Sequence, residues 1–282
     1  MEDGDLALFP GADLQVRNHD VHYPFRQQSD FWYLTGHQEP GSLLMLARGV
    51  EGCAEDTLFV LPKDPERETW EGIRLGPEGA KSSLGFADAG PLSAISERVG
   101  KALEGASRLW YRLGEHAETD SLVSESLADL RRRVRTGVRP PAAILDPITV
   151  LHELRLFKDP TELDCLRRAG AITEEGHRAA MALARPGGTE FELEAALHWV
   201  FRSNGCDGAG WSYPSIVASG NHACVLHYTS NDGTLQDGDL VLVDAGAEFN
   251  GYAGDVTRCF PVNGSFSAAQ RAVYEVVLVA QE

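Results

Sequence analysis

The 282-residue sequence predicts two successive domains, an α/β domain followed by an α+β domain. In the first half, short apolar runs bounded by Gly, Pro or Asp alternate with amphipathic segments, which is typical of alternating strands and helices. Two proline clusters, Arg139-Pro140-Pro141 and Asp146-Pro147, then interrupt the pattern and predict a domain boundary near Asp146. The second half begins with two helical segments and continues with strand-like ones. We therefore expect domains at residues 1–146 and 147–282.

In the first domain, strands are expected at residues 6–9, 31–34, 43–46, 58–61 and 109–113, and helices at 91–103 and 120–134. Asp120 is a candidate N-cap for the second helix, because apolar residues follow it at helical spacing.

In the second domain, a helix is expected from Pro160 to about Leu183, where Pro186-Gly187-Gly188 ends it. Thr189 and Glu192 form a capping-box pattern, which predicts another helix up to about Ser203. Strands are expected at residues 213–219, 223–227, 240–248 and 252–261.

Composition excludes some classes of partner. The formal net charge is −17 at pH 7, so the phosphates of a nucleic acid would be repelled, whereas metal cations and substrates with a free amine remain compatible. The odd number of cysteines, five, and the acidic N-terminus predict a reducing compartment rather than secretion. No apolar run approaches the length of a membrane span. We therefore expect a cytoplasmic protein without a nucleic-acid or membrane partner.

The most informative segment is a predicted hairpin. Asn250-Gly251 between strand-like segments favours a two-residue turn, because both turn positions require positive φ. Phe249 then pairs with Tyr252, and continuing the ladder places Asp244 opposite Thr257. In this register, Asp244 and Asp255 project from the same face as diagonal neighbours. The apolar residues around Asp244 further predict that both faces of its strand are buried.

Two carboxylates on one buried face repel each other unless a proton or a cation lies between them. Oxygen-only ligation suits hard or borderline ions such as Mn²⁺ or Mg²⁺. The alternative is that Asp244 ends one strand and Asp255 begins the next, with both carboxylates solvated. By residue type alone, His227 is compatible with a structural role at a strand end, and Tyr213 with a position in the core or at its rim.

The sequence around these residues resembles the Xaa-Pro aminopeptidase (aminopeptidase P) family, pita-bread metallopeptidases related to prolidase, creatinase and methionine aminopeptidase. The matching segments are Leu226-His-Tyr-Thr229, residues 237–246 and residues 251–264. Residues 23–36 and 69–76 are similar to the N-terminal domain of bacterial aminopeptidase P, and residues 150–160 to the interdomain junction. The resemblance implies an α/β N-terminal domain of the creatinase/prolidase type, followed by an incomplete α+β pita-bread catalytic domain.

The resemblance also implies a function. The family hydrolyses the bond before a proline in second position, through a hydroxide that bridges two divalent metal ions, usually Mn²⁺. Asp244 would bind one ion and Asp255 would bridge both, while His227 would stabilise the scissile carbonyl or the tetrahedral intermediate. Tyr213 would line the site. Trp70 matches a tryptophan that reaches a neighbouring subunit's site in tetrameric relatives, which implies a homo-oligomer at full length.

The family's metal site also requires a histidine and two glutamates further along the chain. All nine histidines lie at or before His227, and the carboxylates after Asp255 are those of Glu275 and Glu282. We therefore expect that the C-terminal part of the catalytic domain is absent and that this chain alone is inactive. Two alternatives remain open, a prolidase that cuts Xaa-Pro dipeptides and a non-catalytic pita-bread protein that binds partners.

Overall fold

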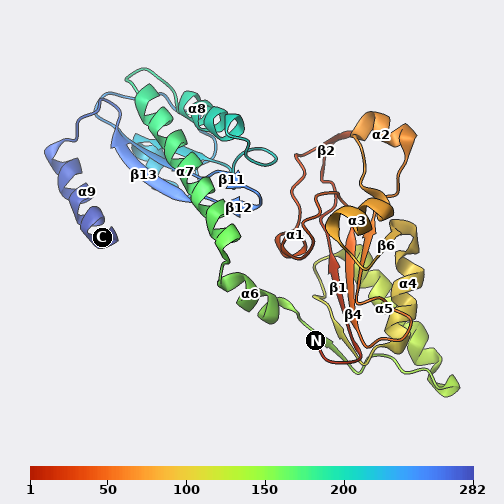
Figure 1. The fold of residues 1–282 in the computed structure, drawn as a ribbon. Helices are drawn as coiled ribbons and strands as arrows, with labels where there is room; N and C mark the ends of the chain where they lie inside the picture. The colour runs from red at the N-terminus through yellow and green to blue at the C-terminus, as the bar shows by residue number, and fades with distance from the viewer. The chain divides into compact units, whose positions relative to one another are not determined.

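Residues 1–282 are all described in the computed structural model, and their contacts divide them into two units, Met1–Phe157 and Lys158–Glu282 (Figure 1). The first unit contains β1 (Asp5–Pro10), β2 (Val16–Asn18), β3 (Val21–His22), α1 (Ser29–Thr35), β4 (Leu43–Arg48), β5 (Asp56–Val60), α2 (Pro65–Glu71), α3 (Gly76–Leu84), β6 (Asp88–Pro91), α4 (Ile95–Gly105), β7 (Arg108–Trp110), α5 (Ala117–Arg132), β8 (Ala143–Leu145) and α6 (Ile148–Leu156). The second contains α7 (Pro160–Leu183), α8 (Glu190–Ser203), β9 (Ile216–Ser219), β10 (Leu240–Ala245), β11 (Glu248–Phe249), β12 (Tyr252–Ala253), β13 (Val256–Pro261) and α9 (Ala268–Gln281). Short 3₁₀ turns lie at Leu92–Ala94, Val134–Thr136 and Gly220–Cys224.

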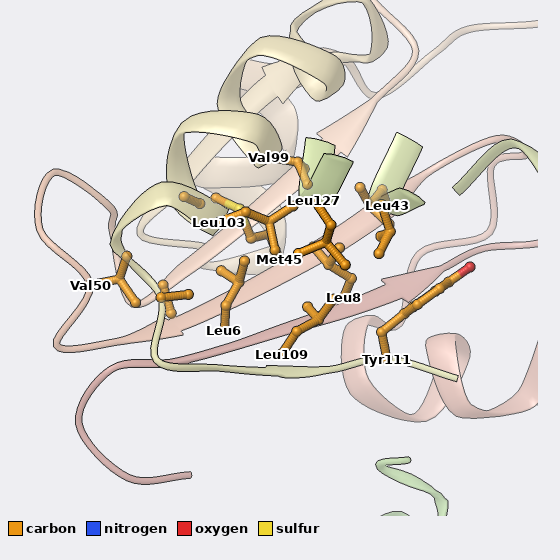
Figure 2. Packing of buried hydrophobic residues seen from close by; sticks show 14 of the residues in the cluster. Leu6, Leu8, Leu43, Met45, Val50, Val99, Leu103, Leu109, Tyr111 and Leu127 are labelled. Carbon is orange, nitrogen blue, oxygen red and sulfur yellow. The ribbon is translucent and has the colours of Figure 1, made fainter. Parts of the chain in front are cut away.

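The first unit is built on a six-stranded sheet in the order β6-β5-β4-β1-β7-β8. Successive residues of a strand point to opposite faces. Leu6 and Leu8 of β1 therefore pack in one apolar cluster with residues of α4 and α5, as Figure 2 shows. Ala7 and Phe9 pack in another cluster, with residues of α1, α3 and α6. Helices cover both faces of the sheet, which confirms the predicted α/β class.

One expected strand of this unit is wrong. Residues 31–34 belong to helix α1, although the run Phe31-Trp-Tyr-Leu34 is rich in residues that favour strands. The side chain of Gln28 caps the first turn by accepting from the N–H of Phe31, and Gly36 ends the helix at φ 63°. These end caps and the burial of Phe31 against the sheet outweigh the local strand preference.

Two predicted helix starts also differ from the structure. The helix expected from residue 91 begins at Ile95, after Pro91 ends β6 and a 3₁₀ turn follows. Helix α5 begins at Ala117 with His116, not Asp120, as its N-cap. Asp120 instead accepts a hydrogen bond of 2.7 Å from the Tyr111 hydroxyl, so a tertiary contact uses the predicted cap.

The predicted boundary near Asp146 falls between β8 and α6, whereas the two units separate after Phe157. Helix α6 joins the first unit because Leu151 is 5% exposed and packs in its core. Arg155 also forms a salt bridge with Asp30 of the same unit.

The second unit places two helices against a three-stranded antiparallel sheet in the order β13-β10-β9 (Figure 1). Leu197 and Phe201 of α8 pack with Val241 and Val243 of β10 in its core. Capping boxes begin both helices, with Asp159 as N-cap of α7 and Thr189 as N-cap of α8, and the predicted extents of these helices are confirmed. The unit has the predicted α+β class.

Two expectations for this unit are wrong. Residues 223–227 form no strand, because a 3₁₀ turn over Gly220–Cys224 begins with Gly220 at φ 52° and a further turn follows it. Burial in β10 alternates, so that Val241, Val243 and Ala245 are buried while Leu240, Leu242 and Asp244 are half-buried. The helices cover one face of this strand, not both.

No helix in the structure combines the length and the apolar character that crossing a bilayer requires.

Candidate metal centre

The hairpin that carries the two aspartates has the predicted turn. Phe249 pairs with Tyr252, and the turn residues Asn250 and Gly251 have φ values of 50° and 75°. The N–H of Gly251 donates a hydrogen bond of 2.8 Å to the carboxylate of Asp207. Asp207 therefore fixes the turn from outside the hairpin, a contact that the local sequence does not indicate.

The predicted register is also confirmed, because Asp244 lies opposite Thr257. The ladder is interrupted between β10 and β11, where Gly246 and Gly254 meet. The N–H of Gly254 donates to the carbonyl of Ala247 over 2.7 Å, and the Ser212 hydroxyl lies 3.0 Å from the Gly246 carbonyl oxygen and 2.9 Å from that of Gly254. The two glycines let the strands approach closely beside the carboxylates.

Helix α7 holds this close approach from the other side. The Thr173 hydroxyl donates to the carbonyl of Ala169 over 2.8 Å and accepts from the N–H of Ala247 over 3.0 Å. A Cβ atom at Gly254 would lie 2.4 Å from the same hydroxyl oxygen, so glycine is required there. The hairpin is thus fixed to the core of the second unit at its narrowest point.

Asp244 and Asp255 converge on one hydroxyl group. The Tyr213 O–H lies 2.5 Å from Oδ1 of Asp244 and 3.1 Å from Oδ1 of Asp255. The distance between these two carboxylate oxygens therefore cannot exceed the sum of their distances to the Tyr213 hydroxyl oxygen. Burial and the adjacent Asp244 carboxylate raise the pKa of Tyr213 well above its usual value, so the phenol keeps its proton.

The carboxylate oxygens of Asp244 and Asp255 are suitable ligands for part of a binding site for a hard divalent cation. Two carboxylates supply oxygen ligands, and their negative charges share a single hydroxyl proton. No group of three or more His, Cys, Asp or Glu side chains is arranged to hold a metal ion. Asp244 and Asp255 are thus the residues of this chain that could contribute carboxylate ligands here.

His227 and Trp70, the two remaining predicted site residues, lie outside the hydrogen-bonded cluster of Asp244, Asp255 and Tyr213. His227 is exposed in the turn that follows the 3₁₀ segment. Trp70 lies on α2 in the first unit and is 87% exposed. Tyr213 precedes β9 rather than belonging to a strand, and of the predicted residues it alone joins the two aspartates.

Sequence reasoning missed two buried polar groups in this unit. The carboxylate of Glu190 is fully buried in a network that ties together residues 219–233. The imidazole of His177 is buried under β10, with Nε2 at 3.4 Å from the carbonyl oxygen of Ala245, and burial lowers its pKa. The capping pattern places Glu190 at a helix start. The hydrogen-bond partners of its carboxylate are too distant in sequence for any local pattern to reveal them.

Replacing Tyr213 with phenylalanine tests whether the carboxylates of Asp244 and Asp255 repel each other. In Tyr213→Phe the shared donor is lost, and we expect the free energy of unfolding to fall by about 1.5–3 kcal/mol without added metal, the usual range for hydrogen bonds to charged groups. Saturating Mn²⁺ should reduce this loss, because a cation between the carboxylates replaces the proton. Urea titrations with and without Mn²⁺ measure both values.

Tyr252→Phe is the matched control for this substitution. It removes a hydrogen bond of 2.8 Å to the Glu162 carboxylate in the same unit. Its effect on the free energy of unfolding should not depend on Mn²⁺. An equal loss with and without Mn²⁺ in Tyr213→Phe would contradict a cation site at the aspartate pair.

Two family models match the chain, one in each unit. Residues 164–282 match the model of metallopeptidase family M24. Residues 1–110 match the model of the aminopeptidase P N-terminal domain, so the chain carries that domain followed by part of an M24 pita-bread domain.

Individual relatives agree with this assignment. The chain is 43% identical to Xaa-Pro aminopeptidase of Escherichia coli over 282 residues, which are 100% of this chain and 64% of that protein. Zinc-substituted Escherichia coli aminopeptidase P in complex with product matches with a TM-score of 0.94 and 43% identity, over 99% of this chain and 63% of that one. Pseudomonas aeruginosa aminopeptidase PepP matches with a TM-score of 0.94 and 41% identity over the same shares. The chain thus spans less than two thirds of the length of these relatives.

Proposed function

We propose that the protein is a metal-dependent aminopeptidase that removes the first residue from peptides with proline in second position. The observation that carries this proposal is the convergence of Asp244 and Asp255 on the Tyr213 hydroxyl, in a chain that is 43% identical to an Xaa-Pro aminopeptidase. The same geometry in an unrelated chain would support a cation site but no particular substrate.

The proposed cofactor is a pair of divalent ions, with Mn²⁺ as the metal in the cell. Asp244 would contribute to one ion and Asp255 to both, and the remaining ligands would come from a histidine and two glutamates that this chain does not supply. When bound, such ions polarise the scissile carbonyl and lower the pKa of an attacking water. Because the structure of a relative is of a zinc-substituted form, comparing Mn²⁺ with Zn²⁺ in the peptidase assay tests the proposed metal.

The other proposed roles rest on the resemblance to the aminopeptidase P family. His227, exposed in a turn, would donate a hydrogen bond to the carbonyl oxygen of the bond that is cut. Tyr213 would keep the aspartates oriented through its hydroxyl. A proline after the cut has no N–H and a fixed φ, so the leaving-side pocket must accept a ring rather than donate to an amide.

The indole of Trp70, 87% exposed on α2, would be covered by a neighbouring subunit in a homo-oligomer. An exposed large aromatic side chain is typical of such interfaces. The odd number of cysteines favours a reducing compartment, so the proposed location of the enzyme is the cytoplasm.

The test is a peptidase assay with the protein as its gene encodes it, loaded with Mn²⁺. We expect release of the first residue from Xaa-Pro-Yaa tripeptides, at least a hundredfold slower release from Xaa-Ala-Yaa, and weak activity on Xaa-Pro dipeptides. Preference for dipeptides would identify a prolidase instead. No turnover of any Xaa-Pro peptide would refute the proposal and favour a binding protein.

A polypeptide limited to residues 1–282 provides the contrast. We expect it to cleave none of these peptides and to hold two metal ions only weakly, because no third His, Cys, Asp or Glu side chain joins Asp244 and Asp255. Metal-dependent cleavage by this polypeptide would show that the proposed ligand count is wrong.

A further inference from the structure

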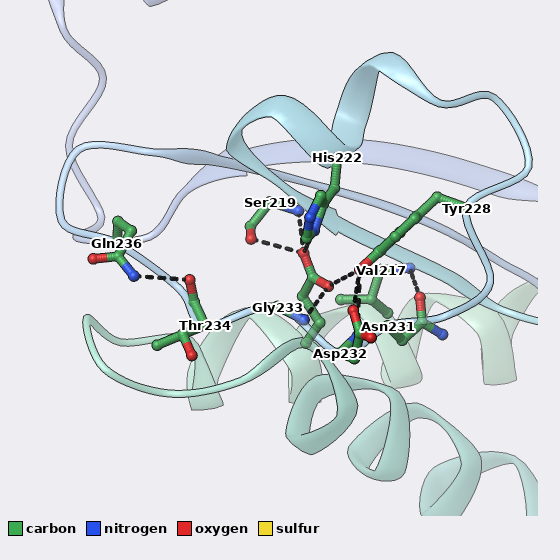
Figure 3. A network of polar contacts seen from close by, with 10 residues as sticks. Val217, Ser219, His222, Tyr228, Asn231, Asp232, Gly233, Thr234 and Gln236 are labelled. Atoms are coloured by element: carbon green, nitrogen blue, oxygen red, sulfur yellow. Dashed lines mark hydrogen bonds and ion pairs between the residues drawn. The ribbon is translucent and has the colours of Figure 1, made fainter.

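Glu190, the first residue of α8, has a fully buried carboxylate at the centre of a hydrogen-bond network. Its Oε1 accepts from the N–H and the hydroxyl of Ser219, both over 2.7 Å, and lies 3.0 Å from Nδ1 of His222. Its Oε2 accepts from the Tyr228 hydroxyl over 2.8 Å and from the N–H of Gly233 over 2.7 Å. Figure 3 shows these partners gathered around one point.

The partners of Glu190 come from both ends and from the interior of one segment, residues 219–233, which we call the His227 loop. Apart from Ser219, which is the last residue of β9, the loop has no strand, and its regular structure is a single 3₁₀ turn. A segment of this length loses considerable conformational entropy when it is fixed. A single carboxylate that binds both ends and the middle therefore determines much of the path of the loop.

Further contacts reinforce the loop around Glu190. The rings of His222 and Tyr228 stack with centroids 4.5 Å apart. The side chain of Asn231, which is 1% exposed, donates to the carbonyl of Ser215 over 2.9 Å and accepts from the N–H of Val217 over 2.8 Å. The loop is thus anchored on both sides of His227, while the imidazole of His227 itself stays exposed.

The network requires an ionised carboxylate. Burial alone would raise the pKa of Glu190, but hydrogen bonds from Ser219, Gly233 and Tyr228 outweigh burial and lower it. A carboxylate is an acceptor on both oxygens, whereas a glutamine would direct an N–H₂ group towards N–H and O–H donors. The isosteric substitution Glu190→Gln should therefore disrupt the network without changing the shape of the side chain.

We propose that Glu190 is a positioning residue that fixes the His227 loop and thereby presents the His227 imidazole to the substrate. This inference rests on the proposed function for the role of His227. It assigns Glu190 no contact with the substrate, because its carboxylate is fully buried and surrounded by loop donors. The substitution should therefore act on the mobility of one loop and, through His227, on turnover.

Hydrogen exchange tests the structural half of the proposal on the complete protein. In Glu190→Gln we expect the amides of residues 221–232 to exchange at least tenfold faster, with protection in α7 and in the C-terminal half of α8 unchanged. Tyr228→Phe, which removes a single hydroxyl donor, should give a smaller acceleration in the same residues and remains informative if Glu190→Gln does not fold. Unchanged exchange in the loop, or equal loss of protection across the second unit, would overturn the proposal.

Glu192→Gln is the matched control. It removes the same charge from the first turn of the same helix, and glutamine can keep the capping bond that Glu192 accepts from the N–H of Thr189. Its partners lie outside residues 219–233, so exchange in the His227 loop should stay within twofold of the unsubstituted protein.

A double-mutant cycle tests the functional half. If Glu190 acts through His227, Glu190→Gln should lower kcat for an Xaa-Pro-Yaa peptide at least tenfold with KM within twofold, and should add less than twofold to the defect of His227→Ala. Independent, multiplicative losses would contradict positioning through His227. If the unsubstituted protein cleaves no Xaa-Pro peptide, the proposed function fails, whereas the hydrogen-exchange result still decides whether Glu190 fixes the loop.

Discussion

Replacing Gly246 with alanine is expected to destabilise the second unit by on the order of 4 kcal/mol or more, the range reached when a substitution forces apart a packed backbone. A Cβ atom at this position would lie 1.7 Å from the carbonyl oxygen of Gly254 and 2.4 Å from its carbonyl carbon. Both are backbone atoms that the hairpin cannot move without losing the register that brings Asp244 and Asp255 together. Urea unfolding and calorimetry of the second unit measure the loss.

Gly170→Ala is the control for this prediction. Gly170 lies inside helix α7 of the same unit, and a Cβ atom there would meet no other atom within 4 Å. Because alanine is favoured over glycine in a helix, the substitution should stabilise the protein by about 0.5–1 kcal/mol. If the two substitutions had similar effects, the close approach of Gly246 and Gly254 would not be a feature of the folded protein.

Replacing Asp244 with asparagine is expected to lower both Mn²⁺ affinity and peptidase activity of the complete protein by at least a hundredfold. The substitution keeps the size of the side chain and removes the negative charge that a divalent cation needs from this oxygen ligand. The Tyr213 hydroxyl can still donate to the asparagine oxygen, so the hairpin should remain folded. Isothermal titration with Mn²⁺ and the tripeptide assay measure the two effects separately.

Asp237→Asn serves as the comparison for Asp244→Asn. Asp237 is exposed and accepts a hydrogen bond of 2.8 Å from the Asn263 side chain, on the loop that leads into β10. Its substitution removes the same charge near the same strand and should leave metal affinity within twofold. Equal effects of the two substitutions would mean that overall charge, rather than ligation by Asp244, controls metal binding.

The sequence predicts correctly those parts of the fold that are determined by residues close together in the chain. Asn250-Gly251 fixes a turn by itself, because its φ values exclude most other residues, and the strand period then sets the pairing of Asp244 with Thr257. Thr189 and Glu192 likewise define the start of α8 within four residues. The carboxylate pair could be predicted because both determinants are local.

The errors arise where distant contacts outweigh local preference. Residues 31–34 favour a strand but become helical, because Phe31 packs against a sheet whose strands lie elsewhere in the chain. Residues 223–227 favour a strand, yet the carboxylate of Glu190, more than thirty residues earlier, contacts His222 and Tyr228 on either side of them. The resemblance implies that Tyr213 lines the site, but no local pattern predicts its bridging hydroxyl contact, because its aspartate partners lie 31 and 42 residues further along.

Anomalous diffraction from crystals of the complete protein grown with Mn²⁺ tests the central claim most directly. The account predicts a manganese peak within coordination distance of carboxylate oxygens of both Asp244 and Asp255, and its loss in crystals of Asp244→Asn. The account would be contradicted if crystals grown with saturating Mn²⁺ gave no anomalous peak beside these two side chains, or if the peak persisted unchanged in Asp244→Asn.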